Sequence, residues 1–234
     1  MKVILDAGHG LSTPGKRSPD GLKEYEINRA IASYSKEALS LYDNVQVIYT
    51  HSDAMDVPLQ TRTEQANALA ADCFISIHSN AAGNGHDWHT ASGIETYVYT
   101  KPNQQARMLA DKIHQQLIAT TGLINRGIKK ADFHVLRETK MPAILVECGF
   151  MTNQQECKLL RSTLFQKTCG DAIANGIAQT FSLKKKNSRN MDTHNAKGIY
   201  KVQVGAFTEK KHADALAQLL EKQGHHPYIA FEKN

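Results

Sequence analysis

The segment Val3-Ile-Leu-Asp-Ala-Gly-His-Gly10 is an apolar run that leads directly into a histidine with glycine on both sides. Two further apolar runs end in a chemically active side chain, Phe74-Ile-Ser-Ile-His78 in a histidine and Ala143-Ile-Leu-Val-Glu147 in a glutamate. Short apolar runs of this kind are typical of buried strands in a parallel sheet. Open α/β sheets bind ligands at the carboxyl ends of their strands. The three runs therefore predict one site at which the side chains that end them meet.

Strand-like and helix-like segments alternate from the first residue to about residue 183. The predicted strands after the first are 45–49, 73–78, 93–99, 133–136 and 143–147. The predicted helices, in which apolar residues recur every three or four positions, are 23–42, 59–71, 104–121, 154–160 and 164–181. This alternation predicts an α/β domain over residues 1–183, with a mainly parallel, twisted sheet flanked by helices.

The remainder of the chain predicts a linker and a small second unit. Residues 184–197 contain almost no apolar side chains, which is typical of a linker. Residues 198–234 predict a strand at 199–207, a helix at 209–223 and a strand at 227–231. A βαβ unit of this size rarely has a sufficient core of its own, so we expect it to need a partner.

The composition is that of a soluble globular protein, with 41% hydrophobic and 22% charged residues among 234. Because no apolar run approaches the roughly 18 residues that span a bilayer, a membrane protein is not expected. The first predicted strand begins at Val3, which leaves no room for a secretory signal peptide. We therefore expect the protein to accumulate in the cytoplasm and to reach targets outside only after the membrane is permeabilised. The cysteines are expected to be reduced core residues, because none has the spacing of a metal site: Cys73, Cys148, Cys157 and Cys169.

The formal charge of +5 and the isoelectric point near 8.9 favour anionic partners. Part of the excess lies in the run of three lysines at 184–186. Aromatic and basic residues do not alternate as they do on RNA-binding surfaces, so nucleic acid is not an expected partner. On charge alone, a polyanionic surface fits as well as a nucleic acid does.

His9, Glu24 and His78 are the best candidates for a metal site. Two histidines and one glutamate are a known ligand set of catalytic zinc, which keeps a fourth position open for water. Glu24 lies in the first turn of the predicted helix 23–42, where a negative charge is favourable and from where it can turn back toward the first strand. On spacing alone, three other carboxylates are alternatives to Glu24: Asp6, Asp20 and Glu26.

Glu147 is the remaining strand-end group and has no predicted metal contact. A carboxyl at the end of an apolar strand is partly desolvated, which raises its pKa and suits it to general acid–base catalysis. We expect Glu147 to take a proton from zinc-activated water and to return it to a departing amine. The alternatives are an ion pair of Glu147 with Arg126 or Arg137, and a cysteine nucleophile at Cys148.

Two further residues are predicted to contact substrate. Asn80 lies two residues after His78, and His134 precedes the apolar pair Val135-Leu136. His86 and His89 lie in a glycine-rich loop and are predicted to be solvated. The other histidines are predicted to lie on the surface: His51, His114, His194, His212, His225 and His226.

Four segments together resemble the zinc-dependent N-acetylmuramoyl-L-alanine amidases of the amidase-3 family: Leu5–Gly10, Gly21–Glu24, Ser76–Asn80 and Pro142–Phe150 followed by Asn153. The resemblance covers about residues 2–182. It implies that His9, Glu24 and His78 bind one Zn²⁺ per chain, which favours Glu24 over the neighbouring carboxylates. It also implies that Glu147 is the catalytic glutamate.

The resemblance implies hydrolysis of the amide bond between the lactyl group of N-acetylmuramic acid and L-alanine in peptidoglycan. Peptidoglycan and anionic wall polymers are then the expected partners. One alternative is a zinc peptidase or deacetylase that acts on another amide. The other is a wall-binding or amidase-activating module that performs no hydrolysis.

The C-terminal segment resembles a SPOR domain, a wall-binding module for glycan strands stripped of peptides, through Tyr200–Phe207. Gln203 and Phe207 are the expected glycan contacts. SPOR domains usually contain two βα halves, whereas residues 198–234 supply one, so a homodimer through paired half-domains is a hypothesis. The combined layout is similar to wall amidases of spore-forming bacilli and of their phages, and a phage protein would accumulate in the host cytoplasm.

Overall fold

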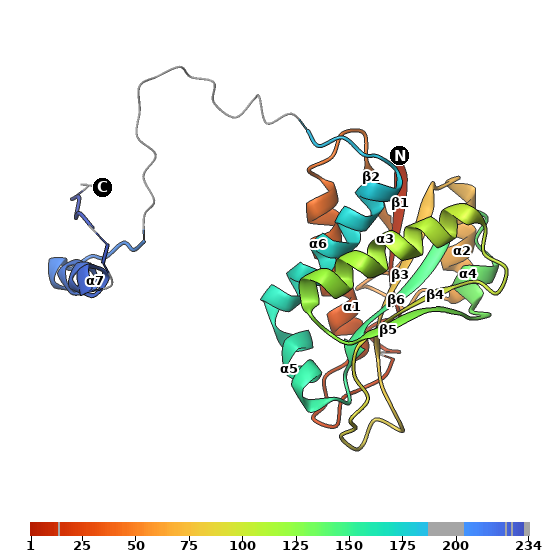
Figure 1. The fold of residues 1–234 in the computed structure, drawn as a ribbon, viewed down its shortest axis with the longest axis horizontal. Helices are drawn as coiled ribbons and strands as arrows, with labels where there is room; N and C mark the ends of the chain where they lie inside the picture. Colours follow the sequence, from red (N-terminus) through yellow and green to blue (C-terminus); the bar gives the residue numbers. More distant parts are fainter. Residues whose placement is uncertain (14, 187–203, 223, 226, 232–234) are drawn as a thin grey trace. The chain divides into compact units, whose positions relative to one another are not determined.

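The structure is a computed structural model that describes residues 1–13, 15–186, 204–222, 224–225 and 227–231 (Figure 1). The chain divides into two compact units, residues 1–187 and 188–234. Among the described residues, every helix is too short or too polar to span a membrane.

The first unit is built on a six-stranded sheet in the order β2-β1-β3-β6-β4-β5. The strands are β1 (Lys2–Ala7), β2 (Gln46–Tyr49), β3 (Cys73–Asn80), β4 (Ile94–Val98), β5 (Asn125–Lys130) and β6 (Ala143–Phe150). Strands β1, β2, β3 and β6 run parallel, whereas β4 runs antiparallel to β6 and β5 runs parallel to β4. The prediction of a mainly parallel sheet flanked by helices is confirmed.

Three helices cover one face of the sheet and form the larger core with it: α1 (Glu24–Leu39), α3 (Gln104–Thr121) and α6 (Thr163–Thr180) (Figure 1). Helix α6 packs against both α1 and α3. Two glycines of α6 permit this close approach. A Cβ atom on Gly170 would collide with the backbone of α1 at Ser35, and one on Gly176 would collide with the backbone of α3 at Ile113. Helix α5 (Gln154–Arg161) joins β6 to α6 and contacts both.

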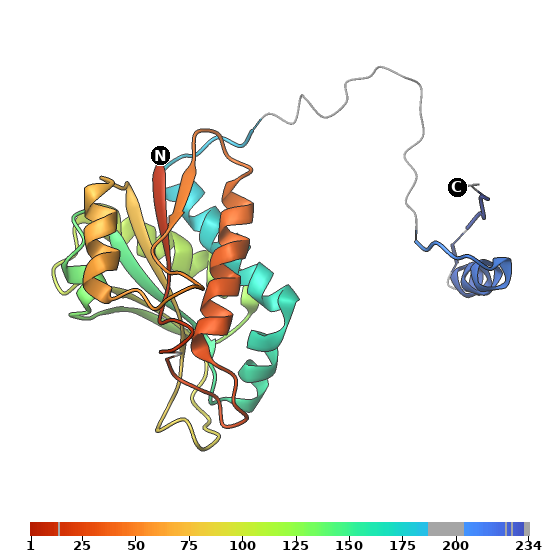
Figure 2. The ribbon, with the colours of Figure 1, turned by 180° about the vertical axis from the view of Figure 1, so that it is seen from behind.

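The opposite face is covered by α2 (Leu59–Ala68) and by the short helix α4 (His134–Arg137), which contact each other. The apolar residues beneath them come from the amino-terminal parts of the strands: Ile4, Phe74, Ala143 and Leu145. Farther along the same strands, the residues that alternate onto this face are polar: Asp6, Ser76, His78 and Glu147. This face therefore changes from apolar to polar toward the carboxyl ends, from which the loops after β1 and β3 extend beyond the sheet (Figure 2).

The structure corrects several predictions in the first unit. The predicted strand 133–136 is wrong, because His134–Arg137 forms the helix α4. Strand β5 has no counterpart in the prediction, because its sequence Asn-Arg-Gly-Ile-Lys-Lys is polar and mostly exposed at the sheet edge. His114 is buried at 5% exposure, and His51 is partly buried against Tyr49, so neither is a surface residue. His114 bonds Thr96 Oγ1 through Nδ1 at 2.9 Å.

The second unit contains one described helix, α7 (Lys210–Lys222), within the segment predicted as helical. The described residues 204–207 and 227–231 are not strands, which differs from the prediction for these segments. Residues 199–203, and with them the predicted glycan contact Gln203, lie outside the described residues. The other predicted contact, Phe207, is 48% exposed, and its ring lies 6.4 Å from that of His212.

Candidate active site

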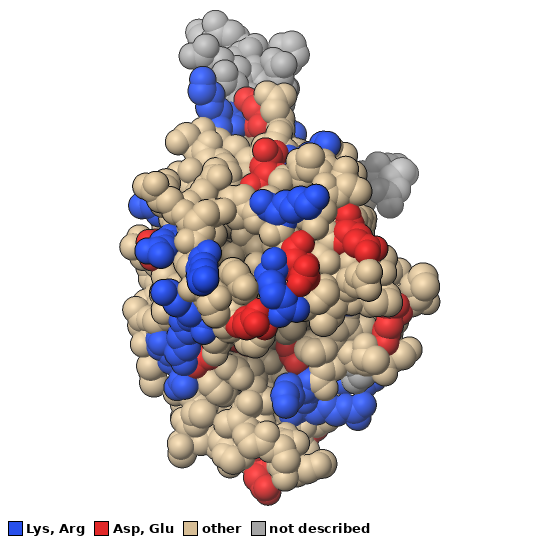
Figure 3. Space-filling model, turned by 90° about the vertical axis from the view of Figure 1, so that its right-hand side faces the viewer, with Lys and Arg blue, Asp and Glu red and all other residues tan. Residues whose placement is uncertain are grey.

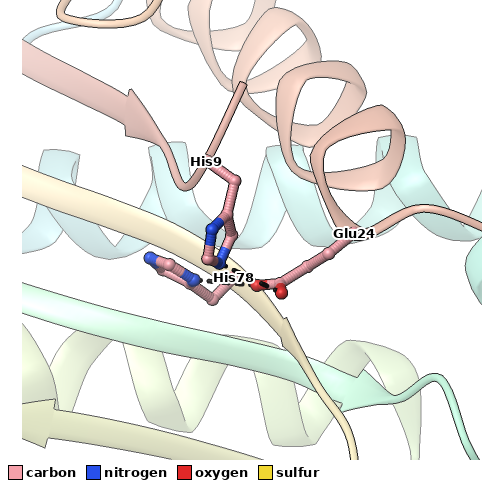
Figure 4. A group of neighbouring side chains, drawn as sticks. All are labelled: His9, Glu24 and His78. Carbon is pink, nitrogen blue, oxygen red and sulfur yellow. Dashed lines mark hydrogen bonds and ion pairs between the residues drawn. The ribbon is translucent and has the colours of Figure 1, made fainter. Parts of the chain in front are cut away.

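Three side chains from separate elements converge at the carboxyl end of the sheet (Figure 4). His9 follows β1, Glu24 is the first residue of α1, and His78 lies in β3. His9 Nε2 lies 3.1 Å from Glu24 Oε2, and His78 Nδ1 lies 2.8 Å from Glu24 Oε1. The three candidate ligand atoms all lie within 4.8 Å of one another, and no other group of histidine, cysteine or acidic residues in the described part of the chain converges in this way.

Glu24 is buried, at 2% exposure, and is held from several sides. The backbone N–H of Lys16 donates to its Oε2 at 2.8 Å, and Asn28 Nδ2 donates to its Oε1 at 3.4 Å. Burial alone would raise the pKa of the Glu24 carboxyl, but the hydrogen bonds and charges of His78 and His9 outweigh it and hold this pKa well below its usual range. Glu24 is therefore ionised, as a carboxylate that binds a metal must be.

The three alternative carboxylates have other positions or partners. Glu26 is exposed on α1. Asp6 is buried in an ion pair with Arg62 at 2.8 Å. Asp20 pairs with an exposed arginine of α5 at 2.7 Å. Glu24 is the carboxylate that reaches the two histidines.

Arg62 of α2 holds the turn that carries His9. His9 has a left-handed backbone with φ 73°, which is uncommon for a residue with a Cβ atom. The buried Arg62 guanidinium donates to the carbonyl oxygen of His9 at 2.5 Å and to that of Ala7 at 2.7 Å. It also donates to Asp6 Oδ1 at 2.8 Å, and this carboxylate accepts from the Thr50 hydroxyl as well. The buried ion pair thus fixes the backbone on both sides of Gly8.

Two glycines make room for the side chains of His9, Glu24 and His78, because a glycine has no Cβ atom. A Cβ atom on Gly8 would overlap the imidazole of His78. A Cβ atom on Gly15 would overlap both His9 and Glu24, and Gly15 also has a φ of +79°. Gly8 and Gly15 are therefore required because the side chains of the candidate ligands lie directly against the backbone at these two positions.

Replacing Gly15 with alanine is expected to lower zinc affinity by roughly 10- to 100-fold, the loss typical of removing a group that orients a metal ligand. Gly21→Ala is the matched control, because Gly21 has a similar φ of +88° but no atom near the position of a Cβ. Both variants suffer the same backbone strain, and only Gly15→Ala displaces ligand side chains. Competition with a fluorescent zinc chelator measures the difference, and equal affinities in the two variants would contradict the steric argument.

Glu147 lies in β6 directly beside the cluster. Its register partners are His78 on β3 and Glu95 on β4, so its side chain shares a face with both. Glu147 Oε2 is the one buried side-chain oxygen or nitrogen among the described residues without a hydrogen-bond partner. Burial, followed by the negative charges of the Glu24 and Glu95 carboxylates, raises the pKa of the Glu147 carboxyl well above its usual value. A carboxyl in this state can take up a proton and hold it.

The alternative roles for this strand do not fit the geometry. Arg126 pairs with Glu95, and Arg137 pairs with Asp132 and Glu138, so neither arginine forms the ion pair with Glu147 that the sequence left open. Cys148 is fully buried on the opposite face of the strand. Its thiol contacts that of Cys169, and this contact together with burial raises its pKa well above the usual value, which is the reverse of what a nucleophile needs. All four cysteines are buried and unbridged.

The two predicted substrate contacts have different surroundings. Asn80 Nδ2 donates to Glu95 Oε2 at 3.2 Å, so Asn80 belongs to a polar group beside Glu147. His134 begins α4, and its Nε2 lies 3.3 Å from Thr63 Oγ1 on α2. It is not one of the three side chains that converge as candidate metal ligands. His86 and His89 are exposed in the loop after β3.

Sequence reasoning missed the charged residues Glu95 on β4 and Lys129 on β5, and it considered Arg126 only as an ion-pair partner of Glu147. Arg126 Nε donates to Glu95 Oε1, and Lys129 Nζ donates to the same oxygen at 2.7 Å. A signal was present, since Glu95 and Tyr97 alternate with Ile94, Thr96 and Val98 and so lie on one face of a strand. The polar sequence of β5 concealed that this strand exists.

The fold and the cluster define the chain as an α/β protein with a candidate metal-dependent hydrolytic site. The model of the N-acetylmuramoyl-L-alanine amidase family matches residues 3–179, which is more than half of the chain. The chain belongs to this family of peptidoglycan hydrolases. The model of the SPOR domain matches residues 174–233, beginning inside α6.

Two relatives and two solved structures align with most of this chain. The N-acetylmuramoyl-L-alanine amidase CwlM of Bacillus licheniformis is 36% identical over 225 residues, which cover 96% of this chain and 82% of CwlM. The sporulation-specific N-acetylmuramoyl-L-alanine amidase of Bacillus subtilis has the same identity and coverage. The solved catalytic domain of CwlV from Bacillus (Paenibacillus) polymyxa var. colistinus is 33% identical, with a TM-score of 0.72, and the match covers 78% of this chain and 99% of that domain. An amidase structure from Clostridium difficile 630 gives 33% identity and a TM-score of 0.73 over 77% of this chain and 96% of that one.

Proposed function

We propose that this chain hydrolyses the amide bond between N-acetylmuramic acid and L-alanine with one Zn²⁺ held by His9, Glu24 and His78, and with Glu147 as the catalytic acid–base group. The observation that carries the proposal is the buried, unpaired oxygen of Glu147 in register with one of three converging ligand side chains. Membership of the N-acetylmuramoyl-L-alanine amidase family supports the identity of the cleaved bond.

The donor set fits zinc. Two imidazole nitrogens and an ionised carboxylate point at one another within the span of a single coordination shell, and two histidines with one glutamate are a known catalytic set. The protein supplies three ligands, which leaves one tetrahedral position for water or substrate. When bound, zinc polarises a carbonyl oxygen and lowers the pKa of water.

Glu147 supplies the proton transfers. Its carboxylate takes a proton from the attacking water as the carbon–oxygen bond to the lactyl carbonyl carbon forms. It then gives this proton to the alanine nitrogen as the carbon–nitrogen bond breaks, so that a neutral amine leaves. The raised pKa of Glu147 suits both steps, because a carboxyl of ordinary pKa holds a proton too weakly near neutral pH.

The first experiment is incubation of purified peptidoglycan with the protein, with and without a chelator. The expected result is release of new L-alanine amino termini without new reducing sugar ends, loss of release on chelation, and recovery with Zn²⁺. Cleavage of a different amide would favour a zinc peptidase or deacetylase. No release from a zinc-loaded protein would favour the wall-binding module.

The SPOR match and the positive charge support binding to the wall. The net charge of +5 favours anionic wall polymers, although the face shown in Figure 3 intersperses basic with acidic side chains and carries no continuous basic surface. Binding that depends on such dispersed charge is weakened by salt. Pelleting with purified walls is therefore expected to decrease when the salt concentration is raised, and salt-independent pelleting would count against anionic polymer as the partner.

In the same assay Phe207→Ala tests the exposed ring as a glycan contact, and unchanged pelleting on peptide-free glycan would exclude it.

Two further predictions concern the whole protein. A homodimer through the C-terminal unit would sediment as a dimer at micromolar concentration, and a strict monomer in the analytical ultracentrifuge would exclude it.

Accumulation in the producing cell's cytoplasm before membrane permeabilisation predicts recovery in the cytosolic fraction, and recovery from the medium of intact cells would contradict it.

A further inference from the structure

A buried carboxylate organises a charged group beside Glu147. Glu95 is 3% exposed, and its two oxygens accept hydrogen bonds from four side chains. Oε1 accepts from Arg126 and Lys129, and Oε2 accepts from Tyr97 at 2.5 Å and from Asn80 at 3.2 Å. We call these five residues the Glu95 cluster.

The Glu95 cluster lies on the catalytic face of the sheet. Glu95 is the antiparallel register partner of Glu147, and Lys129 is the register partner of Tyr97, so these four side chains project from the same face. Arg126 and Asn80 reach this group through their hydrogen bonds to Glu95. Strands β6, β4 and β5 are consecutive in the sheet. Because neighbouring strands lie about 4.8 Å apart, the basic residues of β5 stand roughly 10 Å from Glu147.

The cluster carries a net positive charge with hydrogen-bonding capacity left over. Burial alone would raise the pKa of Glu95, but hydrogen bonds from Lys129, Tyr97 and Arg126 lower it to about 2, so one negative charge faces two positive ones. The side chains of Arg126 and Lys129 remain 35% and 41% exposed. Lysine has three donors and arginine has five. Within the described part of the chain, Lys129 uses one on Glu95, and Arg126 has no recorded acceptor for its Nη2.

A purely structural role leaves this exposure unexplained. One lysine or one arginine would neutralise Glu95, and a second cation at a half-exposed edge adds little to stability. Two basic heads fixed by a buried carboxylate are, in contrast, a preorganised site for an anion.

We propose that Arg126 and Lys129 bind a free carboxylate of the peptide stem while the amide bond at its first residue lies beside Glu147. This inference rests on the proposed function. An extended peptide advances about 3.5 Å per residue, so roughly 10 Å separates the scissile bond from the second or third residue of the stem. The Glu95 cluster is then the part of the site that distinguishes free from amidated stems.

Lys129→Gln is the better test of the two basic residues, because Arg126 also packs over the Phe150 ring and its loss affects folding. Lys130→Gln is the matched control. Lys130 is the next residue of β5, is exposed, and pairs in register with Val98, so it projects from the opposite face. Lys129→Arg keeps the charge and is expected to retain most of the wild-type preference.

The experiment compares kcat/KM on three soluble muramoyl-peptides: one with free stem carboxylates, one amidated at the second residue and one amidated at the third. The wild type and Lys130→Gln are expected to prefer the free acid by about tenfold or more over one of the amidated forms, the scale of a charge-assisted hydrogen bond. Lys129→Gln is expected to lose this preference through a higher KM on the free acid, with its rate on the amidated substrate unchanged.

Equal loss on all three substrates, or no loss on any, would overturn the inference, and the proposed amidase function of the wild type would still stand. A wild type that cleaves all three forms equally would overturn it as well. Failure of the proposed function is a separate result, since the zinc-loaded wild type would then release no L-alanine amino terminus from any of the three, and the inference would fall with it.

Discussion

Glu147→Gln is expected to lower kcat by about 10²- to 10⁴-fold, the usual contribution of a positioned acid–base group. Glutamine keeps the size of the side chain and its place between His78 and Glu95 in the sheet, but it can neither take a proton from water nor hand one to the amine. KM is expected to change little. Zinc content is expected to stay at one per chain, because the proposed ligands come from the turn after β1, from α1 and from β3, and none comes from β6.

The measurement is single-turnover and steady-state release of L-alanine amino termini, with zinc content determined on the same samples. Glu26→Gln is the control, since Glu26 is exposed on α1 and two residues from a proposed ligand. It is expected to keep wild-type turnover and zinc. A Glu147→Gln enzyme that retained a tenth of the wild-type kcat would refute the acid–base role, and loss of zinc would make Glu147 part of the metal site instead.

The place of Glu147 on a buried central strand could be predicted because local sequence records burial. The predicted strand end was wrong, since β6 runs on to Phe150 and Glu147 lies within the strand. A short apolar run such as Ala143–Val146 is typical of a strand that is buried on both faces in the middle of a sheet. Neighbouring parallel strands have their carboxyl ends at the same edge of the sheet. The choice of Glu24 needed the family resemblance, because Glu26 and Asp20 satisfy the same spacing. In the structure it is the first turn of α1 that turns Glu24, and not Glu26, toward the histidines.

The Glu95 cluster could not be predicted because strand direction and edge pairing leave little trace in the sequence. Strand β4 has the same alternation whether it runs parallel or antiparallel to β6, and only the antiparallel register brings Glu95 opposite Glu147. Strand β5 is polar, since an edge strand has one neighbour and open solvent. The partnership of Arg62 with His9 joins residues 53 positions apart, through a backbone carbonyl that no side-chain pattern encodes.

Arg62→Ala is expected to destabilise the protein by about 3–5 kcal/mol, because it leaves the buried Asp6 carboxylate without its partner. Asp6 is 1% exposed and Arg62 is 3% exposed. Burial alone would raise the pKa of Asp6, but the Arg62 charge and hydrogen bonds from Thr50 and Ser76 hold it below its usual value, so the carboxylate stays charged in the core. Urea unfolding of the metal-free protein measures the loss.

Arg29→Met is the matched control for stability. Arg29 also pairs with an aspartate, Asp53 at 2.6 Å, but both side chains are about half exposed. An exposed pair contributes roughly 0–1 kcal/mol, so this variant is expected to unfold close to the wild type. A similar loss in both variants would mean that burial of the Asp6–Arg62 pair carries no special cost.

The double variant Asp6→Asn with Arg62→Met separates stability from positioning. Replacing both members of a buried pair by uncharged groups of similar size is often close to neutral for stability. The Thr50 and Ser76 hydroxyls donate to different oxygens of Asp6, so asparagine can accept from one of them through Oδ1 and donate to the other through Nδ2. The hydrogen bonds from Arg62 to the carbonyls of Ala7 and His9 remain lost. If the buried pair acts by holding the left-handed turn at His9, the double variant regains most of the stability while its zinc affinity stays roughly 10- to 100-fold below that of the wild type. Recovery of both together would show that Arg62 serves only to neutralise Asp6, and that the turn at His9 holds its conformation without it.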